Sequence, residues 1–74
     1  MLTEIKNLHT QIDHDHLVRV ILTKPNLEVS IGKDDIIRVT QSGMLRIVRA
    51  NGNITSINPE YIVMVCPMKR GALL

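Results

Sequence analysis

Residues 44–58 read MLRIVRANGNITSIN, in which apolar and polar side chains alternate on both sides of a glycine. This alternation is typical of β-strands, and a glycine between two such runs is typical of a hairpin. A two-residue turn would pair Arg46 with Ile57 and mix polar and apolar side chains on each face. A three-residue loop over residues 50–52, with Gly52 in the left-handed conformation, removes that conflict. We therefore predict a hairpin with the longer loop.

The longer loop also sorts the side chains of the hairpin by face. Val48 meets Ile54 on one face. The other face collects the remaining apolar side chains together with one threonine: Leu45, Ile47, Ile57 and Thr55. A hairpin sorted in this way has an apolar face that can be buried in a core.

The chain on either side of the hairpin continues in the same β pattern. Four more apolar or alternating runs predict strands, over residues 17–23, 27–31, 36–40 and 61–66. Turn-forming residues separate the strands, at 24–26, 32–35, 41–43 and 58–60. Pro67 is expected to end the last strand, because proline cannot donate a hydrogen bond to a sheet. Residues 68–74 are then expected to form a flexible C-terminal tail.

The start of the chain carries a helical repeat instead. Apolar side chains recur at spacings of three, three and four residues, at Leu2, Ile5, Leu8 and Ile12. They share one face of an amphipathic helix over about residues 3–12. Such a short helix is marginal alone and must dock its apolar stripe on something. We expect it to close one end of the β core; the alternative is that it presents the stripe to a partner.

Length and composition limit the chain to one small domain, expected over residues 1–67. The 74 residues are 45% hydrophobic and include Tyr61 as the only aromatic residue, so the core must be aliphatic. Cys66 is the only cysteine, which excludes an internal disulfide and indicates a reducing compartment. A core this small often needs a metal ion or self-association as a supplement.

Two of the predicted strands are apolar on both faces, since residues 20–22 and 62–66 are continuous apolar runs. Either the sheet curls into a small barrel, or a second face is buried between subunits. The predicted fold class is mainly β: a short N-terminal amphipathic helix, then about five or six short antiparallel strands in a small barrel or roll over about residues 16–66. A homo-oligomer is the simplest way to cover the second face.

The sequence predicts a cytoplasmic protein with no membrane partner. No apolar run approaches the roughly 20 residues that span a bilayer. Residues 1–4 have neither the basic nor the apolar part of a signal peptide. The net charge of +2 permits contact with nucleic acid without requiring it.

Residues 13–16, Asp-His-Asp-His, form the cluster with metal-ligand side chains. On an extended segment His14 and His16 point the same way and could chelate Zn²⁺, but a tetrahedral site needs further ligands. The alternative is a polar connector in which Asp13 or Asp15 accepts hydrogen bonds from free backbone N–H groups. We expect the connector, and no metal or other cofactor.

Sequence motifs of enzymes are missing, because the chain contains no GxGxxG, P-loop, HExxH or CxxC pattern. Cys66 lies in an apolar run, where we expect a thiol to be buried and inert. The adjacent carboxylates Asp34 and Asp35 are typical of a turn. We therefore expect no enzymatic activity.

Basic side chains on the predicted β portion are the candidate nucleic-acid contacts: Arg19, Arg38, Arg46, Arg49 and Lys33. In an oligomer they could form a phosphate-binding face, because the guanidinium fork suits phosphate oxygens. Arg46 and Arg49 have opposite parity, so they cannot share one surface of a flat strand. The alternative is ordinary solvated charge balanced by acidic residues. With one aromatic residue, the chain also lacks the base-stacking platform usual in single-stranded nucleic-acid modules.

Two segments carry a resemblance to a known family: LVRVILT, residues 17–23, as a first strand, and NPEYIVMVCP, residues 58–67, as a last turn and strand. With the helix before them, their order is similar to that of the Sm-like barrel family of the Hfq type. The resemblance covers nearly the whole chain, as topology rather than motif. It departs from the family at residues 24–26, where the family has a glycine, and at residues 59–60, where it has Lys-His.

The resemblance implies a ring-shaped homo-oligomer and points to RNA as the ligand. SH3-like barrels and the strand-rich start of LytTR-type DNA-binding domains fit the same pattern. We therefore expect a small non-enzymatic, homo-oligomeric β-barrel that acts as a binding module for RNA or another nucleic acid. The alternative is a protein-interaction or regulatory module that docks a partner through its apolar helix or strand edges. A metal-dependent protein that uses His14 and His16 is the most distant hypothesis.

Overall fold

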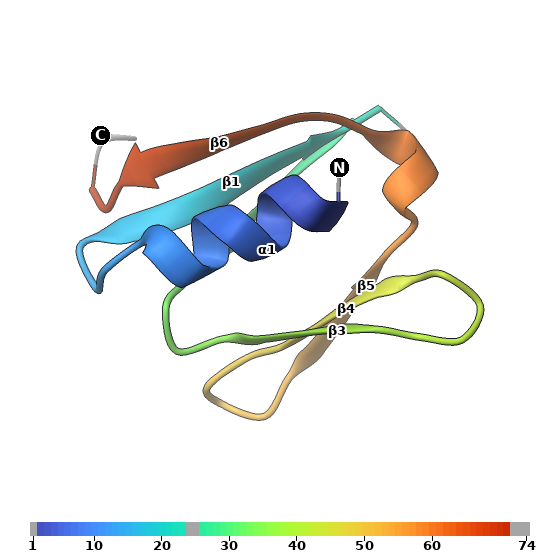
Figure 1. Cartoon of the computed structure of the whole chain (residues 1–74), viewed down its shortest axis with the longest axis horizontal. Helices are drawn as coiled ribbons and strands as arrows, with labels where there is room; N and C mark the ends of the chain where they lie inside the picture. Colours follow the sequence, from blue (N-terminus) through green and yellow to red (C-terminus); the bar gives the residue numbers. More distant parts are fainter. Residues whose placement is uncertain (1, 24–25, 72–74) are drawn as a thin grey trace.

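The computed structural model describes residues 2–23 and 26–71, and these contain one α-helix followed by six strands (Figure 1). The elements are α1 (Leu2–Gln11), β1 (His16–Leu22), β2 (Leu27–Ile31), β3 (Ile36–Val39), β4 (Leu45–Val48), β5 (Ile54–Ile57) and β6 (Ile62–Lys69). A short 3₁₀ helix, η1 (Pro59–Tyr61), lies between β5 and β6. The prediction of a mainly β domain behind an N-terminal helix is confirmed.

The strands of the described residues form two three-stranded antiparallel sheets. We call β2-β1-β6 sheet A and β3-β4-β5 sheet B. The chain passes from sheet A to sheet B through the bend at residues 32–35 and returns through η1, so that β6 pairs with β1. In Figure 1 sheet B lies below β1 and β6, and α1 runs alongside β1. The closure of the two sheets into one barrel stays a prediction.

The core is aliphatic, as the composition requires, and the helix and both sheets contribute to it. Its buried side chains are Ile5, Ile12, Val18, Val20, Leu22, Val29, Ile31, Leu45, Ile47, Ile57 and Ile62. Leu2 and Leu8 pack against this cluster from α1. The apolar stripe of the helix therefore faces the sheets, as expected of a helix that covers the β core.

The hairpin of β4 and β5 has the predicted register. Val48 is paired with Ile54, and Arg49 N donates to Asn53 O at 2.7 Å. Gly52 N donates to Arg49 O at 3.0 Å and closes the loop. Gly52 has a φ of +90°, in the left-handed region that favours glycine. The three-residue loop inferred from side-chain sorting is confirmed.

The predicted end of the last strand is wrong, because β6 continues through Pro67 to Lys69. Among the described strands, β6 is an edge strand of sheet A and pairs only with β1. A proline is tolerated on an edge strand, where its missing N–H leaves no ladder bond unmade. Beyond β6, Arg70 N donates to Asp15 O at 2.6 Å. Residues 72–74 of the expected tail, and residues 24 and 25 of the first expected turn, lie outside the described residues.

Candidate functional site

Two arginines stand directly opposite each other on sheet B. Arg38 on β3 is the cross-strand partner of Arg46 on β4, which is in turn paired with Ser56 on β5. Side chains alternate between the faces of a strand, and the neighbours of Arg46 on β4 are buried. The row Arg38–Arg46–Ser56 therefore lies on the outer face of sheet B, and all three residues are exposed.

This arrangement of like charges is unfavourable by itself. Directly opposed residues of an antiparallel pair lie about 4.5–5.5 Å apart at Cα, and like charges there destabilise the sheet. Among the described residues, the ion pairs join Arg19 to Glu28, Arg49 to Asp35, His14 to Asp34 and His16 to Asp13. None of these pairs includes Arg38 or Arg46. An anion held between the two guanidinium groups would relieve their repulsion.

The turn from β3 to β4 adds polar groups beside this pair. It is closed by the hydrogen bond from Thr40 N to Met44 O at 2.9 Å. Thr40 Oγ1 lies 3.0 Å from Ser42 Oγ and accepts a bond from Met44 N at 3.1 Å. These residues line a shallow surface hollow together with the arginines: Arg38, Val39, Thr40, Gln41, Ser42 and Arg46. The hollow thus combines two cations with hydroxyl and amide donors.

The same face of sheet B also carries an apolar row, one step along the strands. Ile36 is paired with Val48, and Val48 is paired with Ile54. Ile36 is 51% exposed and Ile54 is 59% exposed. The outer face of sheet B is therefore half basic and half aliphatic.

Arg49 has a different role from Arg38 and Arg46. Its Nη1 donates to Ser30 O and to Asp35 Oδ2, the latter at 2.9 Å, and Asp35 Oδ2 also accepts from Gly32 N at 2.8 Å. Burial raises the pKa of the Asp35 carboxyl, but the hydrogen bonds from Gly32 N and Arg49 outweigh it and leave the pKa below its ordinary value of 3.8. The Arg49 side chain therefore links the end of β4 to the bend between the two sheets.

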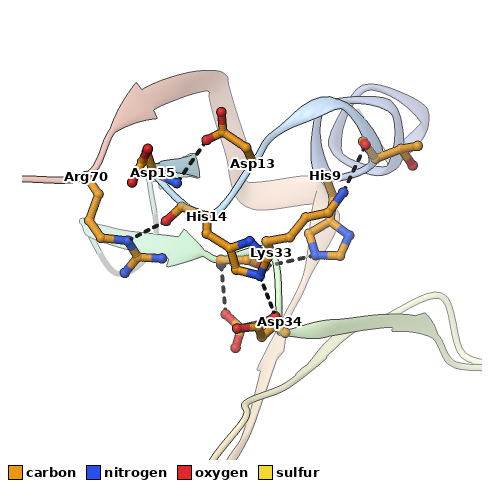
Figure 2. Close-up of polar contacts among 10 residues, drawn as sticks. His9, Asp13, His14, Asp15, Lys33, Asp34 and Arg70 are labelled. Atoms are coloured by element: carbon orange, nitrogen blue, oxygen red, sulfur yellow. Dashed lines mark hydrogen bonds and ion pairs between the residues drawn. The ribbon is translucent and has the colours of Figure 1, made fainter.

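The other two candidate cations are also engaged elsewhere. Arg19 forms a hydrogen-bonded ion pair with Glu28 on sheet A. The hydrogen bond to Glu28 and the negative charge of that residue raise the pKa of Arg19. Lys33 Nζ donates to Thr10 O at 3.1 Å, near the end of α1 (Figure 2). Of the five basic residues singled out from the sequence, the structure brings together only Arg38 and Arg46.

His9 and His14 lie near the helix end and the bend (Figure 2), and each of the three histidines has its own partner. His14 Nε2 is 3.0 Å from Asp34 Oδ1, His16 Nδ1 is 2.7 Å from Asp13 Oδ1, and His9 Nε2 is 2.9 Å from Gly32 O. Within residues 2–23 and 26–71, no three His, Cys, Asp or Glu side chains are grouped so that they could hold a metal ion.

Asp13 acts as the connector interpretation expects. Its Oδ1 accepts from Asp15 N at 2.9 Å. The hydrogen bond with His16 and the one from Asp15 N lower the pKa of Asp13. The segment 13–16 is thus a polar connector between α1 and β1, held partly by Asp13 and partly by Arg70, whose Nε donates to His14 O at 3.0 Å.

The polar residues of the hollow, Thr40, Gln41 and Ser42, were missed as site residues in the sequence. The sequence feature that could have revealed them is the register of the hairpin centred on residue 42. This register pairs Arg38 with Arg46 and brings the turn close to both arginines. In this second hairpin too, the sorting of apolar and polar side chains by face indicates that Arg38 and Arg46 are paired.

The part of the chain that the structure describes contains no helix long and apolar enough to cross a membrane. Comparisons of the chain with protein-family models, with curated proteins and with solved structures found no match.

Proposed function

We propose that this chain is a non-catalytic module that binds the phosphate groups of RNA or another nucleic acid through Arg38 and Arg46. The observation that carries the proposal is the exposed pair of directly opposed arginines, with no carboxylate partner among the described residues. Two adjacent guanidinium groups offer planar forks of donors that match phosphate oxygens. Bound phosphate would also remove their mutual repulsion.

The surroundings of the pair support a backbone contact rather than base recognition. Thr40 and Ser42 provide hydroxyl groups at the edge of the hollow, and hydroxyl donors are common phosphate contacts. Tyr61, the single aromatic residue, belongs to η1 and not to the outer face of sheet B. Base stacking on an aromatic platform is therefore not part of the proposal, and binding is expected to depend weakly on sequence.

We also propose a closed β-barrel that self-associates; the ring form of the assembly is implied by the Sm-like resemblance alone. The pairing of β6 with β1 supports closure, because the chain returns from sheet B and joins its last strand to its first. The small aliphatic core supports self-association, because a domain of this size gains little stability from its own core.

Fluorescence anisotropy with a labelled, mixed-sequence RNA tests the ligand. In low salt we expect binding that weakens as salt rises, because phosphate contacts release counterions. The double variant Arg38→Ala/Arg46→Ala should lower affinity at least about tenfold. Each phosphate contact on a single strand contributes about 0.7 to the slope of log K against log salt, so the loss of two contacts should reduce the magnitude of that slope by about 1.4. Lys6→Ala/Lys69→Ala removes the same charge from α1 and β6 and is the matched control.

An equal loss in the Lys6/Lys69 control would show that only net charge matters and would overturn the role of the arginine pair. The absence of RNA binding at low salt would favour the alternative function, a protein-interaction module. The exposed row Ile36–Val48–Ile54 supports this alternative, because aliphatic surface beside cations suits an acidic, partly apolar protein segment. In that case Ile54→Ser should weaken partner binding, whereas it should leave RNA affinity unchanged under the leading proposal.

A further inference from the structure

Sheet A has an outer face of its own, on the side away from the core. On β1 the side chains of Val18, Val20 and Leu22 are buried, so the alternating residues between them point outward. The register with β6 gathers one apolar set on this outer face: Leu17, Ile21, Met64, Cys66 and Met68. Met64 is 49% exposed and the others are partly exposed. The described residues therefore leave a continuous apolar strip across β1 and β6 in contact with water.

The charges on this face cancel each other. Arg19 and Glu28 lie among the apolar residues and form an ion pair, with each side chain 34% exposed. This differs from the outer face of sheet B, where Arg38 and Arg46 have no opposite charge beside them among the described residues. A partner that fits the outer face of sheet A must therefore be apolar and carry no net charge.

A second copy of the same face meets both conditions. Sheets that pack face to face keep their strands roughly aligned, about 10 Å apart. Consider a two-fold axis that lies between the two facing sheets, perpendicular to the strands and level with the position between Arg19 and Ile21. It places Glu28 of each copy beside Arg19 of the other. The two ion pairs then attract each other across the interface, while the apolar strips cover one another. The same operation on sheet B would bring four arginines together, so that face is unsuited to it.

The size of the face sets the strength of such a dimer. Three strands about 4.8 Å apart, with about seven residues at 3.3 Å each, make a face of about 14 by 23 Å. This is smaller than the footprint of a standard interface, which buries about 800 Å² per partner. We therefore expect a weak dimer, with a Kd of roughly 100 μM rather than nanomolar.

We propose that the outer face of sheet A is the self-association surface of this chain and that its occupant is the same face of a second copy. The inference rests on the self-association in the proposed function and not on its ligand. Because the dimer covers sheet A, it leaves Arg38 and Arg46 on sheet B open to phosphate.

Sedimentation velocity over about 10 μM to 1 mM protein tests the inference, since this range brackets the expected Kd. The wild-type mass should rise from 8.3 kDa towards twice that value. Ile21→Lys should keep the chain monomeric, because it places a cation in the middle of the apolar strip. β1 is the central strand of sheet A, so this change blocks face packing without touching a strand edge. Ile54→Lys, on the outer face of sheet B, is the matched control and should dimerise like the wild type.

If circular dichroism shows that Ile21→Lys is unfolded, Met64→Lys replaces it, because Met64 is already half exposed. Cys66 is partly exposed rather than buried as the apolar run suggested, so its alkylation by iodoacetamide provides a second readout. The alkylation should slow several-fold as the wild-type concentration rises through the Kd. A wild-type chain that is monomeric at 1 mM would overturn both this surface and the proposed self-association. If the wild type dimerises and the Ile21→Lys variant dimerises equally well, the assigned surface alone is overturned. The RNA titration with Arg38 and Arg46 variants is independent of either result.

Discussion

Replacing Arg49 with Ala removes the guanidinium group that joins the end of β4 to the bend between the two sheets. Arg49 Nη1 donates to the backbone carbonyl of Ser30 and to the carboxylate of Asp35. The same carboxylate accepts from Gly32 N and so shapes the bend. The variant therefore leaves a mostly buried carboxylate without its cation and a carbonyl without its donor.

The expected loss follows from these two bonds. A hydrogen bond to a charged group contributes about 1.5–3 kcal/mol, and one between a guanidinium and a carbonyl is of similar or smaller size. The Arg49 and Asp35 side chains are 25% and 13% exposed, so water replaces part of what is removed. We expect the free energy of unfolding to fall by about 2–3 kcal/mol. For a domain of this length, that corresponds to a decrease in Tm of about 10–20 °C.

Thermal and urea unfolding followed by circular dichroism measure this loss, with Arg46→Ala as the control. Arg46 is exposed and is in none of the ion pairs of the described residues, so its removal should change stability by less than about 0.5 kcal/mol. A double-mutant cycle with Asp35→Asn should give a coupling of about 1–2 kcal/mol between the two side chains. Equal stability losses for Arg49→Ala and Arg46→Ala would refute the distinction between a structural and a ligand-binding arginine.

Three further predictions concern the bend, the hairpin and the histidines. The folded-state pKa of Asp35 is below 3.8, so the ionised carboxylate stabilises the fold above that pH, and this stabilisation is lost as pH falls through the folded pKa. Below pH 3.8 the stability of Asp35→Asn should therefore fall less steeply than that of the wild type, as measured by urea unfolding at a series of pH values. Gly52→Ala should cost about 1 kcal/mol through its positive φ alone, since an added Cβ has no neighbour within 4 Å, and unchanged stability would contradict the assigned loop. Zn²⁺ at neutral pH should leave the Tm unchanged, because His14 and His16 bond to different carboxylates; an increase of several degrees would reveal a metal site.

The sequence was sufficient to predict the elements that depend on local pattern. The spacing of Leu2, Ile5 and Leu8 predicted the helix and its buried stripe, and side-chain sorting predicted the loop at Gly52. Both follow from periodicity, which acts within a few residues. The end of β6 was mispredicted because proline is excluded from central strands but tolerated on edges, and the edge position of β6 depends on which strands pair.

The candidate site was harder to predict because it depends on contacts far apart in sequence. Arg19, Arg38 and Arg49 look equivalent as residues. Arg19 and Arg49 take their roles from partners 9 to 19 positions away, whereas Arg38 has no acidic partner among residues 2–23 and 26–71. The fixed register of β3 with β4 is what sets Arg38 against Arg46. Charge counting alone could not separate a cation held by a partly buried carboxylate from one that faces solvent.

An NMR titration of isotope-labelled protein with a short mixed-sequence RNA tests the claim that Arg38 and Arg46 together bind phosphate groups. We predict that the Nε signals of Arg38 and Arg46 and the backbone amides of residues 40–42 shift together and saturate at one common affinity. The Nε signal of Arg49, which is held by Asp35, should stay in place. RNA binding that shifts other residues and leaves the Arg38 and Arg46 signals unmoved would contradict the claim.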